Sequence, residues 1–416
     1  MKLHIPPAFR HRRFRLLWLG LIISVAGTQM QVWSLFWHIR TLTDQPIALG
    51  AVGLVRILPV ILFSLIGGAM ADVVNRRKML FFTQTTMALV ALALAVLTLL
   101  GQIALWQIYL LTAIQAVAVA FDSPARQSMV PNLVPARDLP NAFSLTSIAF
   151  QTGAIVGPAL SGLVIAYWGQ SYTYLINAFS YLAVLSALAL MGPVPQSAAP
   201  GRRAAVSLPA IREGIQFILQ HPIILSTMIL DFFATFFSSA NTLMPVFVRD
   251  VLHAGAVEYG WLSAAQSVGA MAAALVVSQM HAIRRQGPVF LSSVVAFGLA
   301  TIAFGATRTF ALAVLALIFI GAADSVSTII RNTIRQLQTP DYIRGRMTSV
   351  NQIFFMGGPQ LGEVEAGVAA QLFGAPFAII TGGIGCILAV FLIVRRWPQL
   401  LIYYGDEPVI AGAPAD

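Results

Sequence analysis

The chain of 416 residues is 58% hydrophobic and only 10% charged, and its mean hydropathy is +0.81. Soluble domains carry about 25% charged residues, so this composition argues against a soluble protein. The net charge of +10 is common in nucleic-acid binders. Here the cationic residues lie in clusters beside apolar runs, which favours anionic lipid headgroups as partners and no nucleic acid. The only cysteine, Cys386, excludes an intramolecular disulfide and a cysteine-rich metal site.

Twelve hydrophobic runs follow one another along the chain, each near the ~20 residues that cross a bilayer as a helix. The first run follows a positive stretch, as in a signal peptide. It is too long for the apolar region of such a peptide, and it lacks a small-residue cleavage site. We therefore predict twelve transmembrane helices, at about 14–40, 48–72, 79–100, 103–125, 141–168, 171–193, 222–248, 257–281, 288–307, 309–333, 347–373 and 375–394.

The cationic residues give the orientation of these spans. They precede the first run and follow the second, fourth, sixth, eighth, tenth and twelfth, whereas the intervening loops hold only Arg40, Arg249 and Arg308. By the positive-inside rule, the arginine-rich side is cytoplasmic. The sequence therefore predicts an all-α polytopic membrane protein with both termini in the cytoplasm.

A polar segment from Gly192 to Pro209 divides the chain into two halves of six spans. The expected organisation is an N-terminal six-helix bundle over 1–193, a cytoplasmic linker with an amphipathic segment over 194–221, a C-terminal six-helix bundle over 222–396, and a cytoplasmic tail over 397–416. At one constant offset, Pro135, Gly153, Gly157, Gly162 and Gly169 recur as Pro340, Gly358, Gly362, Gly367 and Gly374, and Arg126 recurs as Arg331. Such a duplication predicts two bundles about a pseudo-twofold axis normal to the membrane, with a site between them at mid-depth. Chance alignment of glycines is the alternative.

The loop after the second span holds the most specific motif, Gly68-Ala-Met-Ala-Asp72-Val-Val-Asn-Arg76-Arg77-Lys78. A glycine at a helix end allows close approach to a neighbouring helix. Asp72 can pair with the cationic cluster or with a helix terminus and so latch the cytoplasmic side. The stretch resembles the loop signature of the major facilitator superfamily: Gly68, Asp72, Arg76 and Arg77 match it, whereas Val73 and Asn75 depart from it. A positive-inside cluster with a chance aspartate is the alternative.

A second motif, in the fifth span, is Gly153-Ala-Ile-Val-Gly157-Pro158-Ala-Leu-Ser161-Gly162. Small residues one turn apart let backbones pack tightly, and Pro158 removes a helical hydrogen bond and can bend the helix. The run resembles the antiporter motif of facilitator-family exporters, from which only Ser161 departs. The resemblance implies export rather than uptake. A packing face with no bearing on direction is the alternative.

Three further stretches resemble the branch of the superfamily that contains enterobactin exporters and macrolide-efflux proteins. They are Arg56-Ile-Leu-Pro59, Asp122-Ser-Pro-Ala-Arg126-Gln-Ser-Met-Val-Pro131 and Pro340-Asp-Tyr-Ile-Arg344-Gly-Arg346-Met-Thr-Ser349. The resemblance covers essentially the whole chain. Because the branch spans siderophore and drug exporters, it does not imply a particular substrate.

Acidic side chains at membrane depth are costly, so they mark pathways, ion pairs or proton sites. The candidates for proton coupling are Asp231, Glu363, Glu365, Asp324 and Asp122. Asp231 is the first choice, because it lies about nine residues into its span, near mid-bilayer at ~1.5 Å per residue, with no cation within one helical turn. Glu363 and Glu365 are two residues apart and point to different sides of a helix, so only one is expected to line a cavity. For Asp122, a structural pair with Arg126 is an open alternative.

Arg56, the only cation well inside a span, can contact an anionic substrate or pair with a buried acid. Trp33, Trp37, Phe232 and Phe236 can line a pocket for a ring-bearing ligand, with lipid contact as their alternative role. The sequence has no phosphate-binding loop, nucleophile elbow or metal-ligand spacing, so no cofactor, metal or enzymatic activity is expected.

Together these features predict a monomeric secondary transporter in the bacterial inner membrane. It is expected to export a small amphiphilic molecule, with anionic or aromatic groups, in exchange for protons by alternating access. An importer or facilitator of the same fold, and a non-transporting membrane scaffold or sensor, are the alternatives. A scaffold gains nothing from costly carboxylates inside the membrane.

Overall fold

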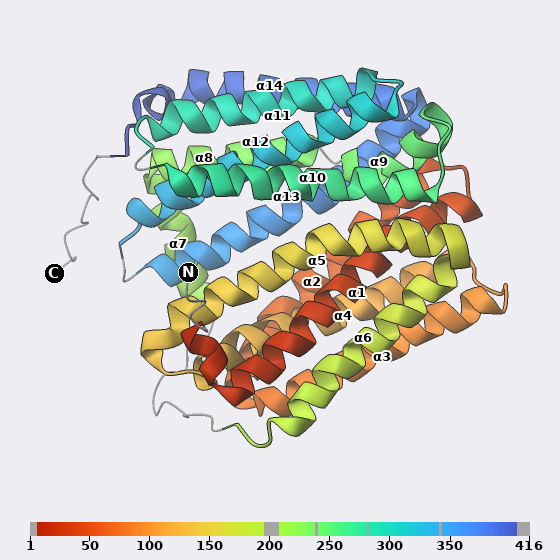
Figure 1. Cartoon of the computed structure of the whole chain (residues 1–416). Coiled ribbons are helices and arrows are strands. Elements are labelled where there is room, and N and C mark those ends of the chain that lie inside the picture. Colours follow the sequence, from red (N-terminus) through yellow and green to blue (C-terminus); the bar gives the residue numbers. More distant parts are fainter. Residues whose placement is uncertain (1–5, 195–207, 238–239, 281–282, 341–342, 406–416) are drawn as a thin grey trace. The chain divides into compact units, whose positions relative to one another are not determined.

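The structure, a computed structural model, describes residues 6–194, 208–237, 240–280, 283–340 and 343–405. Within these ranges it is built of helices, and no strand occurs (Figure 1). Parts of the predicted linker and tail, residues 195–207 and 406–416, lie outside the described residues.

The long helices coincide with the predicted spans, and their ends agree with the prediction to within four residues. In the first half they are α1(Arg12–Leu42), α2(Pro46–Val73), α3(Arg76–Leu99), α4(Leu105–Met129), α5(Leu139–Trp168) and α6(Gln170–Leu190). In the second half, α8(Pro222–Phe237), α9(Ala240–Val246) and the π-helical turn η4(Phe247–Val251) take the place of the seventh span. They are followed by α10(Ala256–Gln279), α11(Gln286–Ala306), α12(Phe310–Leu337), α13(Arg344–Phe373) and α14(Ala375–Arg396). The predicted fold class, all-helical with twelve spans, is confirmed.

Shorter helices fill the loops. They are the 3-10 turns η1(Pro7–Arg10), η2(Val130–Asn132), η3(Ala136–Asp138) and η5(Pro398–Ile402), and the α-helix α7(Leu208–Gln220). Within the described residues, eleven spans are long and apolar enough to cross a membrane by length and composition. The remaining span is α13, 30 residues long. Arg344, Arg346, Glu363 and Glu365 in its sequence lower its hydropathy.

Two glycines of the predicted repeat end equivalent helices. Gly169 follows α5 with a φ of 90°, and Gly374 follows α13 with a φ of 86°. A residue with a Cβ rarely adopts this left-handed region, so glycine ends the helix there and the next helix begins at once. The same helix stop at the same place in both halves supports the predicted duplication.

By their contacts the residues form two units. Unit 1 comprises residues 1–44, 55–205 and 254–264, and unit 2 comprises residues 45–54, 206–253 and 265–416. The first turns of α2 therefore belong to unit 2, and the first turns of α10 belong to unit 1. The domain boundaries expected at 193 and 222 remain predictions, and residues 195–207 between them lie outside the described residues.

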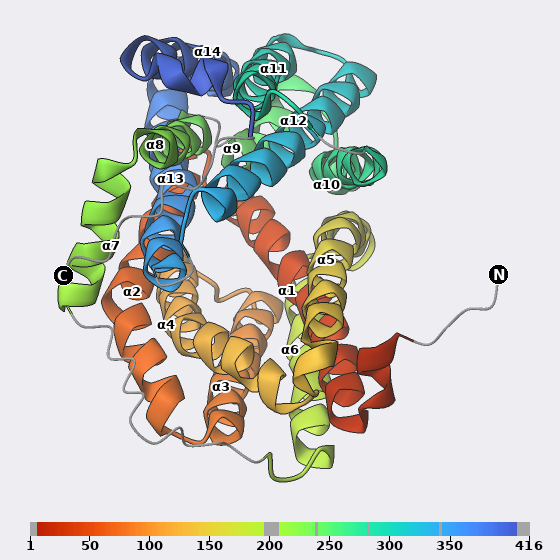
Figure 2. The ribbon, with the colours of Figure 1, turned by 90° about the vertical axis from the view of Figure 1, so that its left-hand side faces the viewer.

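In unit 1, α1 packs against α5 and α6, and α3 packs against α4 and α6 (Figure 2). Apolar side chains near the arginine-rich ends of these helices form a buried core cluster, which includes Phe14, Leu80, Met129 and Leu188. Helices in lipid associate by van der Waals packing and interhelical hydrogen bonds, so close packing of these side chains helps to hold unit 1 together.

In unit 2, α11 packs against α12 and α14, and α8 packs against α13 and α14. The helix α7, which the sequence predicts as amphipathic, packs on α13 (Figure 2). Its Phe217 and Ile218 are buried in one cluster with Met347 of α13. Ile215 and Leu219, one turn apart, are exposed, which leaves an apolar strip of the kind that lies on a membrane surface.

Candidate functional site

The acid that the sequence favours for coupling, Asp231, forms a buried ion pair in unit 2. Nη1 of Arg331 in α12 lies 2.5 Å from Oδ1 of Asp231 in α8, and the two side chains are only 4% and 2% exposed. On its own helix Asp231 has no cation within one turn, as the sequence indicates, but the packing of the helices supplies one. The cation comes from another helix, a hundred residues further along the chain, where spacing within α8 could not reveal it.

This ion pair is poor in hydrogen bonds. Among the described residues, neither carboxylate oxygen of Asp231 and not Nε of Arg331 has a partner with hydrogen-bond geometry. Arg335 and Asp324 of α12 lie near enough to act on the charge of Asp231. Arg335 itself donates to Asn351 of α13. Two of the five candidate acids thus meet in one cluster of two carboxylates and two guanidinium groups.

Asp122, in unit 1, has the opposite character. Its side chain is fully buried, and Oδ1 accepts hydrogen bonds from Oγ1 of Thr83 at 2.9 Å and from Nε2 of Gln84 at 2.7 Å. Its Oδ2 accepts from Arg126, one turn further along α4. Every oxygen of this carboxylate has a partner, as expected of a stabilising buried charge. The geometry favours the structural-pair alternative for Asp122.

The remaining charged candidates lie on α13 and α2. Glu363 and Glu365 are both half-buried. Oε2 of Glu363 would lie 3.1 Å from a Cβ placed on Gly53 of α2. The carboxylate of Glu365 instead lies close enough to Cys386 of α14 to interact electrostatically with its thiol. The two glutamates therefore face different helices within unit 2. Arg56, in the part of α2 that belongs to unit 1, is half-buried.

The candidate aromatic residues form two groups, one in each unit. In unit 1, the rings of Trp33 and Trp37 lie 5.9 and 5.0 Å from the ring of Tyr259, whose hydroxyl donates to the carbonyl oxygen of Trp33 at 2.8 Å. In unit 2, the rings of Phe232 and Phe236 are stacked 6.1 Å apart, one turn apart on α8. Sequence reasoning missed Tyr259, whose role depends on the contact of α10 with α1.

A buried polar network in unit 1 was also missed. Nε2 of Gln31 in α1 donates to Oε1 of Gln115 in α4 at 2.6 Å, and Asn177 in α6 donates to Gln31 at 2.6 Å. The hydroxyl of Tyr181 extends the network to Thr28 at 3.1 Å. Amide side chains inside apolar spans were the available signal, since such groups need partners in lipid.

Two arginines of the predicted cytoplasmic gate, Arg76 and Arg77, donate hydrogen bonds to carbonyl oxygens at helix ends. Arg76 donates from Nε to the carbonyl oxygen of Ala71 at 3.0 Å and from Nη1 to that of Ser128 at 2.9 Å. Arg77 donates from Nε to the carbonyl oxygen of Leu188 at 2.7 Å. These carbonyls belong to the last turns of α2, α4 and α6, where cations stabilise the free acceptors. The two arginines thus join three helix ends within unit 1.

Other residues of this loop differ from the expectation. Asn75, which departs from the superfamily signature, caps α3: its Oδ1 accepts from the backbone nitrogen of Lys78 at 3.1 Å. A Cβ on Gly68 would meet no described atom within 4 Å, whereas one on Gly67 would lie 2.4 Å from the carbonyl oxygen of Ala120. The close approach therefore occurs at Gly67. The side chain of Asp72 lies outside the described residues.

The glycines of the fifth span are packing positions in the structure. A Cβ on Gly153 would lie 2.5 Å from Cγ1 of Val25, and one on Gly157 would lie 2.5 Å from Cβ of Gln29, both in α1. A Cβ on Gly162 would lie 2.6 Å from Cα of Gly260 in α10. The motif thus lets α5 approach two neighbours closely, and its bearing on transport direction remains a prediction.

Fold and sequence together define a multi-pass membrane transporter of the major facilitator superfamily, and not an enzyme. The chain belongs to the Transmembrane secretion effector family, whose model matches residues 5–400.

Two curated relatives are similar over nearly the whole chain. Enterobactin exporter EntS of Citrobacter koseri is 25% identical over 407 residues, which cover 97% of this chain and 96% of the relative. Enterobactin exporter EntS of Salmonella choleraesuis is 24% identical over 399 residues, which cover 96% of this chain and 95% of the relative. The predicted resemblance to the enterobactin-exporter-like branch is confirmed.

Solved structures share the fold. A bacterial homologue of the human lysosomal transporter Spinster, in an inward-facing and occupied conformation, has a TM-score of 0.74 at 14% identity and covers 97% of this chain and 99% of its own. A D-xylose–proton symporter has a TM-score of 0.65 at 15% identity and covers 93% of this chain and 96% of its own. At these identities, the likeness shows the fold alone.

Proposed function

We propose that this protein exports an enterobactin-like small molecule across the bacterial inner membrane in exchange for protons, with both termini in the cytoplasm. The observation that carries the proposal is the buried ion pair of Asp231 and Arg331, whose carboxylate oxygens have no hydrogen-bond partner among the described residues. The names of the relatives support the class of substrate. The cationic loops support the orientation.

Asp231 lies about 14 Å along α8 from its start, close to half of the ~30 Å hydrocarbon core. A buried ion pair is favourable only when further hydrogen bonds satisfy its remaining lone pairs. The pair of Asp231 and Arg331 lacks these bonds, so its carboxylate has acceptor capacity left over. A substrate that carries hydroxyl or N–H donors can use this capacity once α8 becomes accessible.

Protons and substrate then compete for one group. The ionised carboxylate of Asp231 accepts hydrogen bonds from the substrate, whereas the protonated form loses acceptor capacity and releases it. A proton from the outside therefore displaces the substrate there, and loss of that proton on the cytoplasmic side restores the site. Alternation of access between the two sides turns this competition into exchange. Because the ionised carboxylate of Asp231 binds the substrate, substrate affinity should rise with pH.

Proteoliposomes loaded with enterobactin test the proposal. Wild-type protein should move enterobactin when a pH gradient is imposed, and it should also exchange enterobactin without a gradient. Asp231→Asn mimics the permanently protonated form, so it should lose gradient-driven transport and the pH dependence of binding. Asp122→Asn is the matched control, because Asp122 is equally buried and its partners already satisfy it. This control should retain gradient-driven transport.

Folding and coupling are separated by the double variant Asp231→Asn/Arg331→Gln, which removes both charges and leaves none unpaired. If the ion pair is only structural, this variant transports with the gradient as the wild type does, and the coupling role of Asp231 is refuted. Gradient-driven transport that survives Asp231→Asn moves the coupling role to Asp324 or Glu363, whereas wild-type protein that exchanges enterobactin but shows no response to the gradient is a facilitator. If wild-type protein moves no enterobactin, the substrate proposal is refuted.

A further inference from the structure

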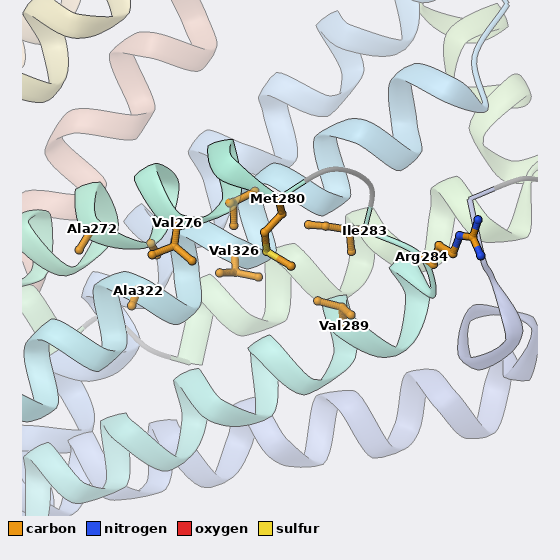
Figure 3. A pocket seen from close by; sticks show the side chains of 10 residues that line it. Ala272, Val276, Met280, Ile283, Arg284, Val289, Ala322 and Val326 are labelled. Carbon is orange, nitrogen blue, oxygen red and sulfur yellow. The ribbon is translucent and has the colours of Figure 1, made fainter.

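A groove of about 550 Å³ lies in unit 2 between α10, α11 and α12 (Figure 3). Its lining includes Ala272 and Val276 from α10, Val326 from α12, and Met280 and Arg284 from the loop that follows α10. In Figure 3 the apolar side chains follow one another along the groove, and Arg284 lies at one end. The groove is therefore apolar along its length and cationic at one mouth.

The position of the groove follows from two glycines. A Cβ on Gly269 in α10 would lie 1.9 Å from the carbonyl oxygen of Ile318, and one on Gly321 in α12 would lie 1.8 Å from that of Gln266. The two helices touch there by their backbones. The groove begins within one turn of this contact, where the small side chains of Ala272 and Ala322 leave space between the helices.

The chemistry of the lining excludes most polar ligands. Polar groups placed along an apolar groove lose their hydrogen bonds to water and gain none. Val276 and Met280 are 64% and 53% exposed, so the groove opens to the side, where hydrocarbon chains of the bilayer can enter. From Ala272 to Met280 the groove runs about 12 Å along α10, which is close to the ~15 Å depth of one leaflet.

The cationic end of the groove indicates which lipid headgroup the site prefers. Arg284 is exposed, and among the described residues no acid pairs with it. Its neighbour Arg285 is held over the ring of Tyr404 at 5.9 Å. The charge map places this end of α10 at the cytoplasmic surface, where anionic lipids attract basic residues.

We propose that the groove binds one acyl chain of an anionic phospholipid from the cytoplasmic leaflet, with its phosphate at Arg284. The apolar chain lies along α10 and replaces the contacts that the two alanines do not make. The guanidinium group binds the phosphate by charge-assisted hydrogen bonds. This site is independent of the transported molecule.

The full-length protein, reconstituted in vesicles of equal parts phosphatidylglycerol and phosphatidylcholine, tests the site. After extraction into detergent, native mass spectrometry measures the lipid that stays bound. Wild-type protein should retain phosphatidylglycerol over phosphatidylcholine by roughly fivefold, the factor expected for one basic residue near an anionic headgroup. Val276→Trp fills the groove and should remove the bound lipid. Arg284→Gln should keep a bound lipid but lose the preference.

Two matched variants control for bulk and for charge. Leu275→Trp places the same side chain on the adjacent residue, which is 60% exposed and does not line the groove, and it should retain the lipid. Arg212→Gln removes an exposed cation from α7 and should retain the preference. The proposal is overturned if Val276→Trp retains as much lipid as Leu275→Trp, or if Arg212→Gln abolishes the preference as Arg284→Gln does. It is also overturned if Val276→Trp keeps the lipid but loses enterobactin transport, because the groove then belongs to the substrate pathway.

Discussion

Arg126 and Arg331 occupy equivalent positions in the two halves of the chain, yet each meets its carboxylate in a different way. In unit 1, Arg126 pairs with Asp122 of its own helix, and two side chains of α3 donate further hydrogen bonds to the carboxylate. In unit 2, Arg331 reaches across to α8. At the offset of the repeat, Ser327 stands where unit 1 has Asp122. The arginine thus keeps its place in both halves, whereas its paired carboxylate lies on the same helix in unit 1 and on another helix in unit 2.

This difference distinguishes Asp122, a structural ion-pair residue, from Asp231, a candidate for proton coupling. A carboxylate with all its acceptors occupied has little to gain from a new partner. A carboxylate that lies close to a cation but accepts no hydrogen bonds can exchange partners at lower cost. The duplicated architecture thus keeps one pair that stabilises a bundle, and the other pair combines burial with incomplete hydrogen bonding.

The largest expected effect is on the stability of unit 2. Arg331→Gln leaves Asp231 buried without its cation, which costs about 3–5 kcal/mol. Arg126→Gln leaves Asp122 with its hydrogen bonds from Thr83 and Gln84, and should cost about 1–2 kcal/mol. Thermal unfolding of the purified variants in detergent measures both. Equal losses in the two variants would erase the distinction between the pairs, and recovery in Asp231→Asn/Arg331→Gln would sharpen it.

A second contrast concerns the glycines that the repeat places at Gly162 and Gly367. In unit 1 a Cβ on Gly162 would lie 2.5 Å from the carbonyl oxygen of Ala256 and 2.6 Å from Cα of Gly260. In unit 2 a Cβ on Gly367 would lie 2.8 Å from Cα of Gly50. Both glycines face a glycine of another helix, but the contact in unit 1 is tighter.

Gly162→Ala should therefore destabilise the protein by about 2–3 kcal/mol and Gly367→Ala by about 1 kcal/mol, within the usual range for overpacking. The measurement is again the unfolding temperature in detergent. Gly68→Ala is the control: with no described atom within 4 Å of its Cβ, it should leave stability unchanged or raise it by up to ~1 kcal/mol. A larger loss in Gly367→Ala than in Gly162→Ala would contradict the packing difference.

Sequence patterns predicted the spans well because lipid imposes length and hydropathy on a helix, and because arginines mark loop sides. They could not predict the pairing of Asp231, since its partner comes from α12 and only the packed helices bring the two together. Tyr259 was missed for the same reason. Asn75 was interpreted only as a departure from the superfamily signature, although asparagine directly before a helix is itself a cap signal. Gln31 and Asn177 were visible as amides in apolar spans, but their partners were not.

The smallest expected effect concerns equivalent loops of the two halves. In unit 1, Asn75 caps α3 with a side-chain hydrogen bond. In unit 2, Arg285 precedes α11 with a φ of 62° and makes no side-chain cap.

Asn75→Ala should therefore cost about 1 kcal/mol, the usual value of a lost cap. Arg285→Ala should cost about 0.5 kcal/mol at most, the value of an exposed cation–π contact such as the one with Tyr404. Asn75→Asp keeps an acceptor at the cap, adds a negative charge at a helix start, and should match the wild type in unfolding temperature. If Asn75→Asp is as unstable as Asn75→Ala, the asparagine acts through its amide donor and not as a cap. The departure from the superfamily signature would then need a different physical reason.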